Sequence, residues 1–190
     1  MRELSKAETL KYLEEINSRL AAEGKHGEIL ITGGAALTLA YNARASTRDI
    51  DAIFRPIEDM RKIISSMAEE YNLPYDWLND HVKIYVTDKI KFDEFMSYSN
   101  LTVSTINAES LLAMKLSSAR FISKDMEDSV FLMKILGIQT ENELFEILDK
   151  YINPVLRKVS VKHFVREAFE KYQETVSYER AASPNTMKFL

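Results

Sequence analysis

Cysteine is absent from the 190-residue sequence, which excludes several classes of protein at once. Without thiols there is no disulfide framework, no thiolate metal site and no cysteine nucleophile. Glycine is also scarce, with five residues in the whole chain. We therefore expect the adjacent pair Gly33-Gly34, directly after an apolar run, to have a structural or chemical role.

Long hydrophobic runs are missing as well. Nowhere do eighteen apolar residues follow one another, so the sequence predicts no transmembrane helix. The first residues, "MRELSKAETLKYLEEINSRL", alternate charge and leucine at helical spacing, unlike the basic segment and apolar stretch of a signal peptide. We therefore expect a soluble, cytoplasmic protein that has no membrane partner.

A strong charge of one sign is the third absence. The formal net charge is -4, which provides no general attraction to nucleic acid or to an anionic membrane. Any anionic ligand must then be held by a few local groups. The hydrophobic fraction of 46% is enough for a sizeable core, either in one domain or in a small mixed domain with a helical extension.

The N-terminal half alternates between helical and strand patterns. Apolar residues recur at helical spacing in two segments, whereas β-branched or alternating runs bounded by Gly or Pro predict strands. "KFDEFMSYS" is compatible with either a loop or a strand. The helices are predicted at 5–22, 35–42 and 57–72, and the strands at 28–32, 48–55, 81–87 and 100–106.

The C-terminal half reads as helical from Asn107 onward, and its last helix is predicted at 160–177. Together the patterns predict an α+β fold, in which a small mixed β-sheet with flanking helices precedes a helical C-terminal half. We expect a core at 1–106, a helical region at 107–180 packed on that core, and a mobile tail at 181–190.

Two aspartates interrupt the apolar strand pattern "RDIDAIFR". Because side chains alternate along a strand, Asp49 and Asp51 are expected on one face, with Ile50 and Ala52 on the other. Two neighbouring carboxylates repel each other unless a cation lies between them. Mg²⁺ suits this position, since it prefers oxygen ligands and is commonly held by one or two carboxylates together with substrate phosphates.

The glycine pair supplies a complementary feature. After a strand, Gly33 and Gly34 allow the backbone to approach a ligand without a Cβ in the way, and the following helix offers unpaired N–H groups. The order strand, Gly-Gly, helix, strand, Asp-x-Asp is therefore suited to bringing a triphosphate and its Mg²⁺ together.

The segment "ITGGAALTLAYNARASTRDIDAIF" resembles the polymerase-β-like nucleotidyltransferase superfamily, in which a Gly-Gly or Gly-Ser turn opens a helix and Asp-x-Asp follows on the next strand. With "DWLND" and "LLAMKLSSARFISKDMEDSVFL", the sequence is similar to minimal bacterial nucleotidyltransferases related to abortive-infection and toxin–antitoxin toxins. The resemblance spans residues 29 to about 136. It implies a sheet of the nucleotidyltransferase type.

The resemblance also implies roles for individual residues. Gly33 and Gly34 would contact the phosphates, Asp49 and Asp51 would be the metal ligands, and Asp125 would contribute an acidic group. Many members of the superfamily place a third catalytic carboxylate on a later strand, but "HVKIYV" has none at its centre. Asp80, Asp88, Asp93 and Asp125 are the candidates for it, and the motif favours Asp125. The resemblance further implies Lys115 and Lys124 as nucleotide-binding residues. Arg48 is expected, with Ser46 and Thr47, on the rim of the same site, and a solvated side chain is the alternative for Arg48.

Several of these residues also have a purely structural explanation. Gly33-Gly34 is compatible with an ordinary strand-to-helix turn, and the two aspartates with a solvated strand face. Lys115 lies in an apolar helical run, where its ammonium needs either a partner or an outward path to solvent. Lys124 and Asp128 are four residues apart and are compatible with a surface ion pair.

The sequence thus predicts a Mg²⁺-dependent nucleotidyltransferase that uses two Mg²⁺ ions. It would move a nucleoside monophosphate from a nucleoside triphosphate such as ATP to an acceptor hydroxyl on RNA, protein or a small molecule. The resemblance adds a toxin role and an antitoxin partner. The alternative is a catalytically weak or inactive module of the same fold that binds a nucleotide or a partner.

Overall fold

The computed structural model describes residues 3–120 and 123–182. The chain divides into two compact units, residues 1–107 and residues 108–190. The first unit contains the sheets and the second is helical, which confirms the predicted α+β fold with a helical C-terminal half. Residues 183–190 of the predicted mobile tail lie outside the described part, whereas Ala181 and Ala182 belong to a helix.

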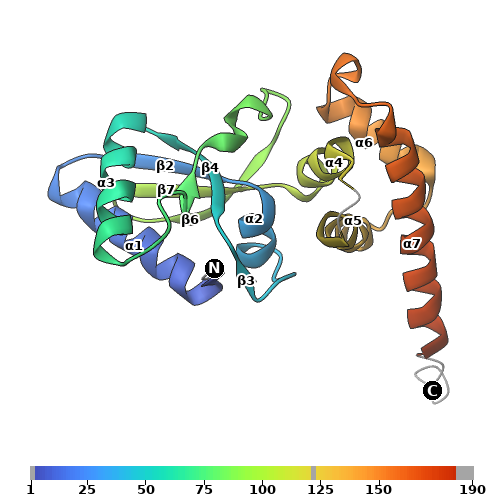
Figure 1. Cartoon of the computed structure of the whole chain (residues 1–190), viewed down its shortest axis with the longest axis horizontal. Coiled ribbons are helices and arrows are strands. Elements are labelled where there is room, and N and C mark those ends of the chain that lie inside the picture. The colour runs from blue at the N-terminus through green and yellow to red at the C-terminus, as the bar shows by residue number, and fades with distance from the viewer. Residues whose placement is uncertain (1–2, 121–122, 183–190) are drawn as a thin grey trace. The chain divides into compact units, whose positions relative to one another are not determined.

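A five-stranded mixed sheet forms the centre of the first unit (Figure 1). Its strand order is β5-β4-β2-β7-β6; β2 is antiparallel to β4 and parallel to β7. The outer strand β5 is parallel to β4, and β6 is antiparallel to β7. The strands are β2 (Gly27–Ile31), β4 (Ile50–Arg55), β5 (Leu78–Asn79), β6 (Phe92–Ser97) and β7 (Leu101–Ile106).

Helices α1 (Lys6–Ala22) and α3 (Ile57–Glu70) cover one face of this sheet. A Cβ at Gly27 of β2 would lie 2.7 Å from a Leu20 methyl group of α1 and 3.2 Å from the Met60 sulfur of α3. Glycine at this position therefore allows both helices to pack closely on the strand. The side chains that line this core on β2, β4 and β7 alternate with half-buried neighbours; they are Ile29, Ile31, Ile50, Ala52, Phe54 and Val103.

Short elements connect the sheet to its surroundings. Helix α2 (Gly33–Leu39) follows β2 after a single residue, Thr32. Strand β1 (Leu4–Ser5) pairs antiparallel with β3 (Ser46–Thr47) in a separate two-stranded sheet. The side chain of Ser5 and that of Glu8 also form a capping box at the start of α1.

The predicted strand at 81–87 is wrong. Residues His81–Ile84 form a 3₁₀ helix, η1, and the large apolar side chains of Ile84 and Tyr85 are exposed to solvent. None of the residues 81–87 is buried, so neither set of alternating side chains packs against the core. Residues 92–97, which were compatible with a loop or a strand, form β6.

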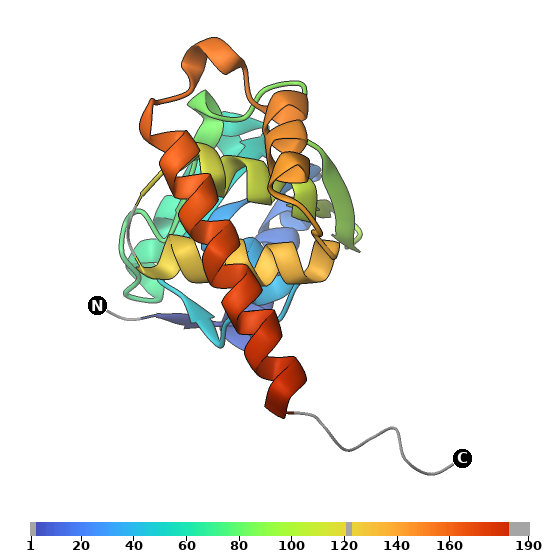
Figure 2. The same ribbon diagram turned by 90° about the vertical axis from the view of Figure 1, so that its right-hand side faces the viewer.

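The second unit contains four α-helices among its described residues, and Figure 2 shows the longest of them, α7, running past the others. Helix α7 extends five residues beyond the predicted end at 177. Its buried face includes Phe164, Val165 and Ala168. The helices are α4 (Ala108–Ser118), α5 (Ser123–Leu136), α6 (Glu141–Tyr151) and α7 (Ser160–Ala182), with a short 3₁₀ helix η2 (Pro154–Leu156) before the last.

Candidate functional site

The Gly-Gly turn and the Asp-x-Asp segment meet where β2 ends and β4 begins. The backbone N–H of Thr32 donates to the carbonyl oxygen of Asp51 at 2.8 Å, and the Thr32 hydroxyl donates to the same oxygen at 3.1 Å. This pair of hydrogen bonds joins the residue before the glycines directly to the second aspartate. Two segments separated by nineteen positions in the sequence therefore form one local structure.

Gly33 is required at this position for two reasons. Its φ angle is +60°, a left-handed conformation that costs an L-residue about 1–2 kcal/mol. A Cβ on Gly33 would also lie only 3.2 Å from Oδ2 of Asp51. The absence of a side chain therefore leaves open the space beside the Asp51 carboxylate.

Gly34 faces a second pair of polar groups. A Cβ at Gly34 would lie 3.2 Å from the Thr47 hydroxyl oxygen and 3.4 Å from Nη1 of Arg44. A guanidinium is a preferred partner for phosphate oxygens. Arg44 was not among the predicted site residues, because its approach to the glycines depends on the path of the loop between α2 and β3. Its position before "STRDID" is the only sequence signal.

Asp49 lies immediately before β4, and Asp51 is the second residue of that strand. Both carboxylates are half-buried, whereas Ile50 and Ala52 between and after them are fully buried. The predicted alternation of faces is therefore present. The Thr47 hydroxyl donates to the carbonyl oxygen of Asp49 at 2.9 Å, which fixes the backbone before the strand.

The electrostatics of Asp49 show that negative charge is concentrated here. Burial raises the pKa of its carboxyl group, and the nearby charges of Asp51 and Asp76 raise it further. Arg48, whose side chain is exposed, and a backbone hydrogen bond act in the opposite direction. In the described part of the chain, neither Asp49 nor Asp51 forms a side-chain ion pair with a basic residue.

These features fit a bound cation that completes its shell with other ligands. The two carboxylates repel each other, neither forms an ion pair with a described basic side chain, and Gly33 leaves room beside one of them. No group of three or more histidine, aspartate or glutamate side chains in the described residues is arranged to hold a metal ion. A Mg²⁺ ion here would consequently rely on waters and substrate phosphates for its remaining ligands, as is common for this ion.

Lys115, Asp125 and Asp128 form a separate cluster in the second unit. Nζ of Lys115 on α4 lies 2.6 Å from Oδ1 of Asp125 and 2.8 Å from Oδ2 of Asp128, both on α5. Only 15%, 14% and 5% of the three side chains is exposed. The ammonium thus has largely buried carboxylate partners, and Asp128 does not lie on the surface, where the spacing of Lys124 and Asp128 suggested an ion pair. The side chain of Lys124 is exposed.

The other candidates for a third carboxylate have different surroundings. Asp80 accepts from Arg61 and Lys83 at 3.0 Å each, and hydrogen bonding to Lys83, with the charges of both cations, lowers its pKa. The side chains of Asp88 and Asp93 are exposed. Asp76, which the sequence did not single out, is the additional carboxylate whose charge reaches Asp49.

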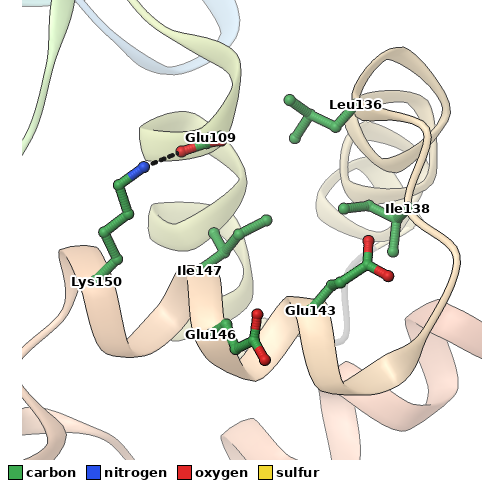
Figure 3. Close-up of a pocket in the computed structure, with 7 residues that line it drawn as sticks. All are labelled: Glu109, Leu136, Ile138, Glu143, Glu146, Ile147 and Lys150. Carbon is green, nitrogen blue, oxygen red and sulfur yellow. Dashed lines mark hydrogen bonds and ion pairs between the residues drawn. The ribbon is translucent and has the colours of Figure 1, made fainter.

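A hollow of about 310 Å³ lies in the second unit between α4, the end of α5 and α6 (Figure 3). Its carboxylates have partners: Glu109 accepts from Lys150 at 2.6 Å, Glu143 from Thr140, and Glu146 from Asn142. It includes none of the predicted site residues. Its lining is Glu109, Leu136, Ile138, Glu143, Glu146, Ile147 and Lys150.

Comparison with known proteins identifies the family. A family model described as "Nucleotidyltransferase of unknown function (DUF6036)" matches residues 8–177. The chain belongs to this nucleotidyltransferase family. The match covers most of both units and confirms the predicted nucleotidyltransferase relationship. No curated protein and no solved structure matches this nucleotidyltransferase. None of its described helices has the length and apolar character needed to cross a membrane.

Proposed function

We propose that this nucleotidyltransferase transfers a nucleoside monophosphate from a nucleoside triphosphate to an acceptor hydroxyl, with Mg²⁺ bound at Asp49 and Asp51. The acceptor oxygen attacks the α-phosphorus, its O–H bond is lost, and pyrophosphate leaves. The acceptor is RNA, protein or a small molecule. A modified acceptor that is essential to the cell would make the chain a toxin with an antitoxin partner, as its sequence resemblance implies.

The observation that carries the proposal is the meeting of Gly33 with Asp51. The left-handed turn at Gly33 leaves the side of the Asp51 carboxylate uncovered, and Asp49 adds a second carboxylate that forms no ion pair with a basic side chain among the described residues. Family membership supplies the reaction class independently of this geometry. The two together favour a triphosphate over other anions, because phosphates share their cation with protein carboxylates.

Each residue of the site has a defined task in this proposal. Asp49 and Asp51 bind the cation, which neutralises the triphosphate and supports the departure of pyrophosphate. Gly33 and Gly34 allow the phosphates to approach the backbone, while Arg44 offers its guanidinium beside Gly34. Positioning of this kind supplies most of the catalysis in phosphoryl-type transfer.

Lys115, Lys124 and Asp125 belong to the proposal through the sequence resemblance, and Arg48 belongs to it through its place directly before Asp49. Arg48 also has support from electrostatics, since its charge acts on Asp49. For Lys115, the two bonds to Asp125 and Asp128 set its ammonium in a fixed place on α4. An ammonium carries three N–H donors, so a phosphate oxygen would be a third partner.

The direct test is transfer of label from each of the four α-³²P nucleoside triphosphates to cell RNA, cell protein and small-molecule extracts in the presence of Mg²⁺. We expect labelled acceptor with the wild-type chain, and loss of at least about 100-fold with Asp49→Ala or Asp51→Ala. Glu14→Ala, an exposed change on α1, is the matched control and keeps the activity. Absence of label in every pool would contradict the proposed transfer.

The second candidate function is binding without turnover. It is favoured by the lack of a three-residue metal-ligating group among the residues that the structure describes. Mg²⁺-dependent binding of a triphosphate analogue, combined with no labelled acceptor, would select this function. Equal labelling by wild type and Asp51→Ala would contradict both functions at this site.

A further inference from the structure

Two threonine hydroxyls hold the backbone of the aspartates in the candidate site. The hydroxyl of Thr32 donates to the carbonyl oxygen of Asp51 at 3.1 Å, and that of Thr47 donates to the carbonyl oxygen of Asp49 at 2.9 Å. Both threonines are buried, with 0% and 6% of the residue exposed. Water therefore has little access to either hydrogen bond, and such a bond is stronger in these surroundings than at an exposed position.

Thr32 occupies the N-cap position of α2 but does not cap the helix with its side chain. A threonine at this position commonly accepts a hydrogen bond from a backbone N–H of the first helical turn, and the Thr32 side chain forms no such bond. Its hydroxyl instead shares the carbonyl oxygen of Asp51 with the Thr32 backbone N–H, which donates at 2.8 Å. Because this oxygen already has a backbone partner, the hydroxyl serves to fix its direction.

Thr47 lies between Asp49 and the second glycine of the turn. Its hydroxyl oxygen is 3.2 Å from the position that a Cβ on Gly34 would take, and the same hydroxyl donates to the carbonyl of Asp49 two residues further along the chain. The backbone of Thr47 is paired in its turn with Leu4 of β1. The hydroxyl therefore has a fixed position between the glycine turn and the first aspartate.

The backbone of residues 49–51 is consequently held at each of its three residues. The two threonines bond the carbonyl oxygens of both aspartates. Between them, the backbone N–H of Ile50 donates to the carbonyl oxygen of Trp77 at 2.8 Å, and the Ile50 side chain is fully buried. Only side-chain torsions then remain to place the two carboxylates. Groups that are in place before a ligand arrives lose less conformational entropy when it binds.

We propose that Thr32 and Thr47 are positioning residues of the Asp49–Asp51 site, and that their hydroxyls keep the two carboxylates in place for a cation. The inference rests on the proposed function, because it requires a cation at the two aspartates. Each threonine acts through the backbone of an aspartate and not by contact with the cation. Groups that orient metal ligands in this way commonly change metal affinity by about 10- to 100-fold.

The test measures Mn²⁺ affinity of the full chain by electron paramagnetic resonance, with a non-hydrolysable triphosphate analogue present. Valine keeps the branched shape of threonine without its hydroxyl, whereas serine keeps the hydroxyl. We expect Thr32→Val and Thr47→Val each to weaken Mn²⁺ binding about tenfold, and Thr32→Ser and Thr47→Ser to keep the wild-type affinity. Thr32→Val is expected to fold, because the carbonyl of Asp51 retains the backbone N–H as its partner.

Thr9→Val is the matched control. Thr9 is fully buried on α1, and its hydroxyl donates to the carbonyl oxygen of Ser5 at 3.0 Å. This variant loses the same kind of hydrogen bond as the other two valine variants, but at a position that holds neither aspartate. It should therefore keep the wild-type Mn²⁺ affinity.

A second measurement needs no metal. Hydrogen–deuterium exchange of the Ile50 amide in EDTA reports how firmly the backbone between the two aspartates is held. We expect faster exchange in Thr32→Val and Thr47→Val than in wild type, and no change in Thr9→Val. Unchanged exchange in both site variants would show that the hydroxyls do not hold this segment, and it overturns the inference.

The outcomes separate this inference from the proposed function. Wild-type Mn²⁺ affinity in Thr32→Val and Thr47→Val, with binding lost in Asp51→Asn, overturns the positioning role and leaves the Asp49–Asp51 site intact. A loss in the valine variants that serine does not restore also overturns it, because the hydroxyl would not be the cause. Failure of the wild-type chain to bind Mn²⁺ with the analogue overturns the proposed cation site and the inference together.

Discussion

At the scale of single residues, the candidate site depends on the absence of a side chain at Gly33. A side chain there would have to adopt a left-handed backbone conformation and would crowd Asp51 at the same time. The first effect concerns the stability of the fold, and the second concerns only the carboxylate. The two effects can be separated by comparing substitutions at two glycines that have the same backbone conformation.

Gly33→Ala is expected to lower stability by about 1–2 kcal/mol and also to weaken Mg²⁺-dependent triphosphate binding. Gly137→Ala is the matched control, because Gly137 has φ +66° but open space around its Cβ position. It should cost similar stability and leave binding unchanged. Urea unfolding measures the first quantity and titration of a fluorescent triphosphate the second. Equal binding in the two variants would contradict a ligand beside Gly33.

The raised pKa of Asp49 predicts a pH-dependent cost in the absence of metal. An aspartate that binds its proton more tightly in the folded chain destabilises the fold once it ionises. The cost begins as the pH rises past the ordinary value of 3.8 and is complete above the raised pKa of the folded state.

Asp49→Asn should therefore melt a few degrees above wild type in EDTA at neutral pH, and this advantage should shrink toward pH 4. Thermal unfolding followed by circular dichroism provides the measurement, and Asp88→Asn, an exposed change, is the control. An advantage that stays constant with pH would contradict this assignment of the pKa shift.

At the scale of elements, the cluster around Lys115 joins α4 to α5. One ammonium lies between two carboxylates, and all three side chains are mostly buried. Removing one member of a buried ionic group leaves the others without compensation, which costs more than the group itself contributes.

Lys115→Met should lower the free energy of unfolding by about 3–5 kcal/mol. Combining it with Asp125→Asn and Asp128→Asn should recover much of this loss, since no uncompensated charge remains. Urea unfolding of the single and triple variants checks both statements. A Lys115→Met chain as stable as wild type would show that the buried carboxylates do not need the ammonium.

The strands and helices also show which elements a sequence pattern can predict. The strands at 48–55 and 100–106 and the helices at 5–22 and 57–72 were predictable, because each has a face that alternates or repeats against a core. Strands β1, β3 and β5 have two residues each, which is too short for any periodic pattern. At 81–87 the alternation was present, but Ile84 and Tyr85 are exposed, so no burial reinforced it.

The candidate site divides in the same way. Gly33 and Asp51 belong to a local motif whose spacing has a chemical meaning, so their meeting could be predicted. Arg44 approaches Gly34 from the loop before β3, and the charge of Asp76 acts on Asp49 from the segment that precedes β5. Such positions depend on tertiary structure, and a single sequence does not contain a pattern for them.

At the scale of the whole molecule, the unfolding of the first compact unit can be followed by its own spectroscopic signal. Trp77, the only tryptophan, lies in the first unit with Asp49 and Asp51, so its fluorescence reports the unfolding of that unit. Helices of both units contribute to the far-ultraviolet circular dichroism. A ligand that binds only the folded state stabilises the unit to which it binds.

We expect a Mg²⁺–triphosphate analogue at 100 times its Kd to stabilise the Trp77 transition by about 2.7 kcal/mol. An equal shift of the circular dichroism transition would support the proposed nucleotide contacts of Lys115 and Lys124 in the second unit. Urea titrations with and without the analogue measure both. A Trp77 transition that the analogue does not move would contradict a nucleotide site in the first unit.

The pairing of β1 with β3 connects the backbone at Leu4 to the candidate site. Leu4 is the register partner of Thr47, whose hydroxyl holds the backbone of Asp49. The backbone that leads into Asp49 is thereby linked to Leu4 through the pairing of β1 with β3. A change that separates Leu4 from Thr47 is therefore expected to loosen the backbone before Asp49 in the candidate site.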